Sequence, residues 1–235
     1  WFSDEGRVAL GHRRLSIVDL SETANQPMLD GKDLVVTFNG EIYNHRQLRA
    51  TLTSSGYNFH TDHSDTEVLL HGYREWGLEG LLKRLEGDFA FAIWDSRKRR
   101  LSLARDRVGV KPLYFASAGG AFIFGSEIKS ILEHPAVVRD IDPMAMYHYL
   151  SFLTTPAPQT MFAGVWKLPA GCWLEVEEGT IGAGRYWDAV PGQGIDPAET
   201  KGLSDKALEA FYVDGIRSRL EEAVEKRMMA DVPVG

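Results

Sequence analysis

The segment at residues 87–95, GDFAFAIWD, is apolar at nearly every interior position instead of alternating between apolar and polar side chains. Successive side chains of a strand point to opposite faces of its sheet. A run that is apolar throughout therefore predicts a strand buried on both faces. Other short runs rich in β-branched and aromatic residues predict further strands at 8–10, 15–18, 34–38, 101–104, 113–115 and 122–124, with weaker ones at 166–168 and 171–176.

Helical patterns separate these runs. Asn44 suits the cap of a helix that stops at Gly56. The segment SDTE at 64–67 has capping-box spacing and opens a helix that Gly77 would stop. Pro143 suits the first position of another helix. Predicted helices are 44–54, 64–77, 126–132, 143–150 and an amphipathic one at 204–229. The Gly- and Pro-containing stretch before the last helix predicts a linker at 188–203.

Charge and cysteine content exclude several classes. The chain has 26 basic and 33 acidic residues, a net charge of −7, which argues against a nucleic-acid surface. The basic run at 97–100 is interpreted as a solvated hairpin turn. A single cysteine excludes an internal disulfide framework and favours a reducing, cytoplasmic location. No apolar run approaches the ~20 residues that span a bilayer. Because the chain opens on Trp1 and stops on DVPVG, we expect an internal stretch of a longer protein.

Asn39-Gly40 is the first candidate site. By itself, Asn-Gly between apolar runs is most often a two-residue hairpin turn. Here a strong strand precedes the pair and a capped helix follows it, so the pair ends a strand instead of joining two. An amide side chain and a glycine N–H at a strand end can together stabilise a developing oxyanion.

Charged residues supply the second candidate. Asp65 is either an acid that complements a helix N-terminus or a carboxylate that holds a substrate ammonium group. Arg13 and Arg14 have two interpretations. Either both are surface residues, or the guanidinium of one of them binds a carboxylate through two hydrogen bonds. The segment HTDHSD at 60–65 is interpreted as a solvated loop and not as a metal site, because no cysteine or distant histidine motif joins it.

Seven segments occur in an order that resembles a known family. They are GHRRLSIVD, NQPM, FNGEIYNH, SDTEVLLHGYREWG, LEGDFAFAIWD, LARDRVGVKPLYF and FGSEIKSIL. Together they resemble the class II glutamine amidotransferases, and within these the glutamine-hydrolysing asparagine synthetases. The later segments KLPAGCWLEV, RYWD and RMMADVPVG resemble the synthetase branch in particular. The resemblance covers essentially the whole chain.

The resemblance implies a set of glutamine-binding residues. Arg14 matches the arginine that pairs with the α-carboxylate of glutamine, and Ile17 and Val18 match adjoining backbone contacts. Asp65 matches the carboxylate that takes the α-amino group. A zwitterion needs one cation and one anion held a fixed distance apart, so these roles agree with the chemistry of the side chains.

The resemblance also implies the catalytic groups. Asn39 and Gly40 match the oxyanion hole, and Glu41 lines the same pocket. The family's nucleophile is a cysteine at the mature N-terminus, whose own α-amine is the base. No residue of this chain matches it. Cys172 falls where the family places no catalysis and is interpreted as a packing residue.

The fold implied by the resemblance is α+β: an N-terminal-nucleophile αββα four-layer sandwich at 1–187, a linker at 188–203, and at 204–235 the opening helix of an α/β ATP-pyrophosphatase domain. The implied reaction takes glutamine, aspartate and ATP with Mg²⁺ to asparagine through a β-aspartyl adenylate, with ATP and Mg²⁺ held in the missing domain and no cofactor or metal within this chain. A homodimer is a possible assembly of the whole protein. The alternatives are a related amidotransferase for another acceptor, in surface-polysaccharide or secondary-metabolite synthesis, and a glutamine-binding domain without catalysis.

Overall fold

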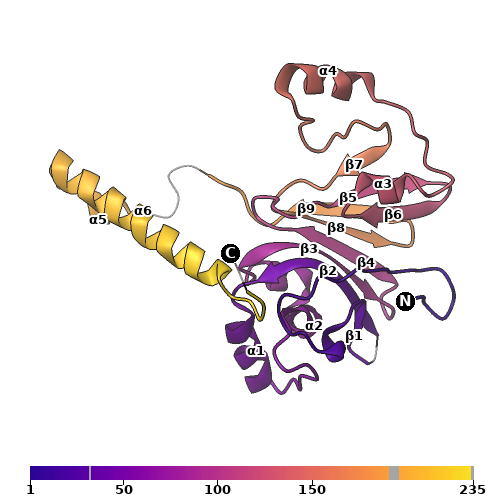
Figure 1. Ribbon diagram of the computed structural model, residues 1–235, viewed down its shortest axis with the longest axis horizontal. Coiled ribbons are helices and arrows are strands. Elements are labelled where there is room, and N and C mark those ends of the chain that lie inside the picture. Colours follow the sequence, from indigo (N-terminus) through magenta and orange to yellow (C-terminus); the bar gives the residue numbers. More distant parts are fainter. Residues whose placement is uncertain (32, 191–195, 234–235) are drawn as a thin grey trace. The chain divides into compact units, whose positions relative to one another are not determined.

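The computed structural model describes residues 1–31, 33–190 and 196–233, and it divides into two compact units, Trp1–Trp187 and Asp188–Gly235 (Figure 1). The nine strands found in these ranges all belong to the first unit. Across these described ranges, no helix is long and apolar enough to cross a membrane.

Two antiparallel sheets form the first unit. The larger has six strands in the order β1-β2-β3-β4-β8-β9, and the smaller has three in the order β6-β5-β7. The larger sheet comprises β1 (Met28–Leu29), β2 (Leu34–Ile42), β3 (Gly87–Asp95), β4 (Arg100–Arg105), β8 (Cys172–Glu177) and β9 (Thr180–Arg185). The smaller comprises β5 (Tyr114–Ala118), β6 (Ala121–Gly125) and β7 (Val165–Lys167).

Strand β3 is buried on both faces, as the apolar run predicted. Phe89, Phe91 and Ile93 point into a core shared with α1 (His45–Ser54) and α2 (Asp65–Leu82). Ala90 and Ala92 point the other way, into a core shared with β5, β6 and β8. The small sheet therefore packs on one face of the large sheet, and helices cover the other face.

A third core lies beyond the small sheet. Ile131 of the short helix α3 (Ile128–Ile131) packs against Ala116 of β5 and Val165 of β7. The layers of the first unit thus run helices, large sheet, small sheet, helix (Figure 1). Helix α4 (Pro143–Phe152) follows, with Pro143 in its first turn and the Asp142 carboxylate accepting from the N–H groups of Met144 and Ala145.

The two earliest predicted strands are wrong. Residues 8–10 make only an isolated bridge, between Phe2 and Ala9. Residues 15–18 form no strand, because the carbonyl of Val18 accepts from the Arg14 side chain and Leu15 is 83% exposed. Strand β9 was not predicted, since its glycines weaken the strand pattern. Gly184 is needed there because an added Cβ would meet the ring of Trp173 at 2.6 Å.

The capping hydrogen bonds at the helix ends differ from those predicted. Asn44 does precede α1, but its side chain bonds Arg84 and Glu86 instead of capping the helix. Ser64 caps α2 by accepting from Thr66 N. Glu67 does not complete a capping box, because its carboxylate binds the loop before the helix. Gly77 interrupts the regular helix, with φ 67° and ψ 179°. A short turn, η1 (Glu22–Ala24), precedes β1.

The second unit contains α5 (Pro197–Thr200) and α6 (Asp205–Arg227). Helix α6 lies where a helix was predicted, although its apolar side chains do not gather on one face, and Ser204 caps it by accepting from Ala207 N. None of the side chains of α6 is buried. The predicted linker includes α5, and its residues 191–195 lie outside the described residues.

Candidate active site

The outer edge of β2 carries the first group of site residues. Phe38 N donates to Gln26 Oε1 at 2.7 Å, and Ile42 N donates to Asp65 Oδ2 at 3.0 Å. The N–H groups of alternate residues in a strand point to the same side. Gly40 lies midway between these two residues, so its N–H is directed to the same edge. Asn39-Gly40 is thus inside β2, paired with Ala90 and Phe89, and the hairpin-turn alternative is wrong. The expectation that the pair ends the strand is also wrong, because β2 continues to Ile42.

Gly40 is held where only glycine fits. Its φ is 150°, and an added Cβ would meet the Asp88 carbonyl oxygen at 2.2 Å. Gly87 faces the same restriction across the ladder, where a Cβ would meet the Glu41 carbonyl oxygen at 2.2 Å. Strands β2 and β3 therefore approach each other closely at the site, and the position of the Gly40 N–H is fixed by both strands.

Asn39 faces the space between the two sheets. It pairs with Ala90, whose side chain belongs to the core between the sheets, and directly opposed residues share a face. The Asn39 amide Nδ2 donates to Ser126 Oγ at 3.4 Å. Ser126 directly follows β6, so Asn39 joins the ends of a strand from each sheet. The segment FGSEIKSIL contained Ser126, but nothing in the sequence assigned it this contact.

Asp65 is a buried carboxylate. It is the first residue of α2 and only 5% exposed, so it is indeed an acid at a helix start. The pKa of Asp65 is raised to about 7, chiefly by burial and also by the nearby Glu41 carboxylate, while the hydrogen bond from Ile42 N acts in the opposite direction. A buried carboxylate with so high a pKa gains most from a cationic partner. The geometry thus suits an ammonium group.

Glu41 occupies the same region. It is directly opposite Asp88 in the β2–β3 ladder. Its Oε1 is buried and has no hydrogen-bond partner among the described residues. Burial raises the pKa of Glu41, Lys111 opposes that rise, and Asp88 strengthens it. Glu41 therefore offers an acceptor that the rest of the described chain leaves unused.

Arg14 bends back onto its own loop. Nη2 donates to the carbonyl of Val18 at 2.8 Å and to the carbonyl of Asp19, while Nη1 donates to the carbonyl of Ser21 at 3.4 Å. Val18 is buried and Ile17 is 37% exposed. Both hydrogens of Nη2 are engaged, so bidentate binding of a carboxylate through Nη2 requires Arg14 to release a carbonyl.

Asp19 connects the Arg14 loop to the start of α2. One carboxylate oxygen accepts from Ser21 N at 3.1 Å and Ser21 Oγ at 2.5 Å, and the other accepts from His63 N at 3.3 Å. Burial opposes ionisation of Asp19, but these hydrogen bonds outweigh it and lower its pKa. Sequence reasoning gave Asp19 no role, although it ends the segment GHRRLSIVD.

Glu67 organises the loop before α2. Its carboxylate accepts from His60 N at 2.7 Å, Thr61 N at 2.8 Å and Thr61 Oγ1 at 2.5 Å. Burial opposes ionisation, but hydrogen bonds from His71, Thr61 and His60 lower the pKa of Glu67 to about 2. Within the described ranges, no three His, Cys, Asp or Glu side chains are arranged to hold a metal. In the HTDHSD loop, Asp62 instead pairs with His63 at 2.8 Å.

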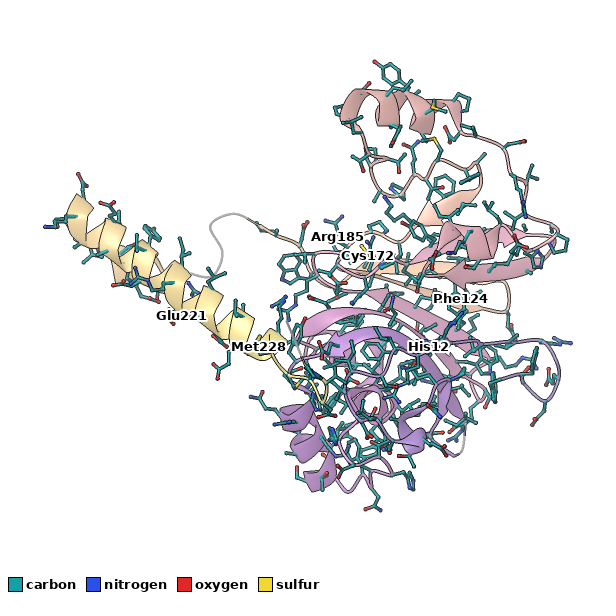
Figure 2. The ribbon with its side chains drawn as sticks, in the orientation of Figure 1. His12, Phe124, Cys172, Arg185, Glu221 and Met228 are labelled. Atoms are coloured by element: carbon teal, nitrogen blue, oxygen red, sulfur yellow. The ribbon has the colours of Figure 1, made fainter. Side chains whose placement is uncertain are left out.

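Cys172 is remote from this group. It begins β8, two strands beyond β3, and it packs against the core between the sheets. At ~4.8 Å per strand, three steps across the sheet separate it from Asn39 by roughly 14 Å. In Figure 2, Cys172 lies beside its ladder partner Arg185, well away from His12, whose Nδ1 is 3.4 Å from Thr37 Oγ1 on β2.

The comparison with protein families decides the assignment. Residues 1–187 match the glutamine amidotransferase domain family. The chain belongs to this family. As an amidotransferase domain it has glutamine as the substrate that its family implies, and the asparagine-synthetase resemblance is confirmed by its relatives.

Asparagine synthetase [glutamine-hydrolyzing] 3 of Bacillus subtilis is 36% identical over 236 residues, covering 98% of this chain and 36% of that protein. Putative asparagine synthetase [glutamine-hydrolyzing] of Mycobacterium tuberculosis is 39% identical over 241 residues, covering 98% of this chain and 35% of that protein. The amidotransferase chain therefore spans about a third of the length of the curated relatives it matches.

Among solved structures, one titled "structure of the allosteric regulatory enzyme of purine biosynthesis" is 22% identical, with a TM-score of 0.49. It covers 70% of this chain and 31% of the other.

Proposed function

We propose that this chain is the glutamine-hydrolysing part of an asparagine synthetase. Glutamine is hydrolysed to glutamate and ammonia, and the ammonia is passed to a β-aspartyl adenylate made from aspartate and ATP. The observation that carries the proposal is the edge of β2. There the Gly40 N–H lies between Phe38 and Ile42, and the N–H of Ile42 binds the buried carboxylate of Asp65. Charge-binding and oxyanion-binding groups thus share one edge of the strand.

Glutamine binding uses the two charged side chains. The α-ammonium group of glutamine binds Asp65, whose charged form it stabilises against the effect of burial. The α-carboxylate binds Arg14 by displacing a loop carbonyl from the guanidinium, next to the backbone of Ile17 and Val18. Asp19 keeps the two binding regions together, because it holds both Ser21 and His63.

The amide of glutamine lies against Asn39 and Gly40. Attack on its carbonyl carbon places negative charge on the carbonyl oxygen. The Asn39 amide and the Gly40 N–H donate to that oxygen, which stabilises the transition state more than the ground state. Glu41 lines the same site. The nucleophile is a cysteine of the longer protein, as the family resemblance implies, and Cys172 lies too far across the sheet to fill this role.

We assign residues 1–187 to an N-terminal-nucleophile amidotransferase domain, 188–203 to a linker and 204–235 to the start of an ATP-pyrophosphatase domain. The layer order of the first unit and the division of the chain at residue 187 support this arrangement. ATP and Mg²⁺ belong to the later domain, and no residue of this chain is assigned to them.

One relative favours a second candidate. Amidase chry2 of Gibberella zeae is 35% identical over 244 residues and covers 100% of this chain. A member with this level of similarity carries a name other than asparagine synthetase. The second candidate is therefore a related enzyme that transfers ammonia from glutamine to a different acceptor.

The full-length protein tests the proposal through asparagine formation with glutamine or with ammonium chloride as nitrogen source. Asp65→Ala should abolish glutamine-dependent synthesis and leave ammonia-dependent synthesis intact, because the ATP site is separate. Asp62→Ala is the matched control, since Asp62 is an exposed acid in the loop just before α2. Loss of both activities in Asp65→Ala would contradict the assigned site. If the wild-type protein hydrolysed glutamine but formed no asparagine, that result would favour the second candidate.

A further inference from the structure

The loop between β4 and β5 is built around one buried carboxylate. Asp106, 1% exposed, accepts through Oδ1 from Val108 N at 3.2 Å and Val110 N at 2.8 Å. Through Oδ2 it accepts from Lys111 N at 2.9 Å and Phe89 N at 3.3 Å. One oxygen atom thus joins the backbone of Lys111 to the backbone of β3.

Arg105 binds the same loop through its carbonyl groups. Its Nε donates to the Lys111 carbonyl at 2.7 Å and its Nη2 to the Gly109 carbonyl at 2.7 Å. Nη1 anchors the side chain to the Leu168 carbonyl at 2.8 Å. The N–H and the carbonyl of Lys111 are therefore both fixed, so the origin of its side chain is set by two buried or half-buried charged residues.

That origin is tied through Asp106 to Phe89, the neighbour of one of two facing carboxylates. Phe89 directly follows Asp88, and Asp88 is the ladder partner of Glu41. Like charges directly opposite in a ladder destabilise it. Tyr43 Oη donates to Asp88 Oδ2 at 2.8 Å, but Oε1 of Glu41 is buried without a partner among the described residues. Lys111 is half-buried, and its positive charge lowers the pKa of Glu41.

We propose that Lys111 is a positioning residue of the glutamine site, whose ammonium group compensates the facing carboxylates of Glu41 and Asp88 and keeps Glu41 charged to accept a hydrogen bond from an N–H of the substrate. This inference rests on the proposed function. It adds a residue that does not touch the reacting atoms and acts through Glu41.

The other charged groups near Glu41 define the background of a pH experiment. Asp88 faces it from β3 and disfavours its charged form. The Glu41 carboxylate in turn raises the pKa of Asp65 at the start of α2. Lys111 is the cation that favours ionisation of Glu41.

Lys111→Met in the full-length protein tests the role, with KM and kcat for glutamine hydrolysis measured from pH 6 to 9. Loss of the cation raises the pKa of Glu41, which makes its charged form rarer at low pH, about tenfold for a pKa raised by one. We expect KM to rise at the acid end of this range, by no more than about tenfold for a pKa raised by one, to approach the wild-type value at pH 9, and kcat to change little. Lys111→Arg should restore the wild-type profile. Lys83→Met, at an exposed lysine after α2, is the matched control.

Glu41→Gln separates this role from a purely structural one. In the Glu41→Gln background, adding Lys111→Met should leave KM and its pH dependence unchanged, because Lys111 acts through the Glu41 charge. A Lys111→Met enzyme with the wild-type pH profile, or an equal effect in both backgrounds, would overturn the inference. Wild-type protein without glutaminase activity would instead overturn the proposed function, so the two failures are distinct.

Discussion

The carboxylate of Asp65 and the backbone N–H of Ile42 are joined by a 3.0 Å hydrogen bond that ties the start of α2 to the end of β2. This bond fixes a buried acid beside Gly40 without supplying a counter-charge. In the proposed site, the cationic partner of Asp65 therefore comes with the substrate.

Asp65→Asn should stabilise the folded protein and weaken glutamine binding. The folded pKa of about 7 lies above the unfolded value of 3.8, so the penalty of ionising Asp65 is absent below pH 3.8 and is fully present above pH 7. The variant should therefore raise the thermal midpoint more at pH 8.5 than at pH 5, and should lose glutamine binding in calorimetric titration.

Asp62→Asn is the control for that experiment and should show neither effect, because Asp62 is exposed. A drop in thermal midpoint of equal size at both pH values would show that Asp65 is a structural residue and not a strained binding group.

Asn39→Ala should lower kcat for glutamine hydrolysis by about 10²-fold or more, since removal of one oxyanion donor typically has this effect. KM should change little, because the donor acts mainly in the transition state. Steady-state glutaminase assays measure both constants. Asn58→Ala, at an exposed loop position, should leave them unchanged. A raised KM with normal kcat would place Asn39 in ground-state binding instead.

Gly40→Ala should cost stability as well as activity. The new Cβ would overlap the Asp88 carbonyl oxygen at 2.2 Å, and the positive φ is unfavourable for alanine. We expect a loss of at least about 1–3 kcal/mol in the free energy of unfolding, measured by urea titration. Gly182→Ala on β9 is the control, because nothing lies within 4 Å of its Cβ position. Equal stability of the two variants would contradict the close approach of β2 and β3.

Glu67→Gln should remove an acid-sensitive contribution to stability. The folded pKa of about 2 lies below the unfolded value of 4.5, so the contribution is present above pH 4.5 and is lost as the pH falls towards 2. We expect about 1–3 kcal/mol of destabilisation at pH 7, as for other buried carboxylates with several hydrogen bonds. Denaturant titrations at pH 7 and pH 3 test it, and Glu75→Gln, exposed on the same helix, is the control.

The sequence predicted those parts of the fold that depend on local pattern. The GDFAFAIWD run was buried on both faces because its alternate side chains enter two cores. Helix α6 was predicted by its spacing alone. The prediction of a strand at 15–18 was wrong because the Arg14 side chain donates a hydrogen bond to the Val18 carbonyl. No local sequence pattern indicates that contact.

The candidate site divides in the same way. Asn39, Gly40 and Asp65 could be proposed because their residue types suit an oxyanion and an ammonium group. Lys111 could not, because its importance depends on how Asp106 folds a loop back onto β3. Contacts between residues far apart in the chain were the part that sequence reasoning missed.

In the Asp106 loop, the side chains that hold the backbone differ from those exposed at the surface. Its form is set from inside by Asp106 and Arg105, while Val108 and Val110 are 67% and 52% exposed. Their side chains do not hold the loop, because the bonds are made by their backbone. An engineer can therefore replace both valines with polar residues to improve solubility, and Lys111 will keep its place beside the site.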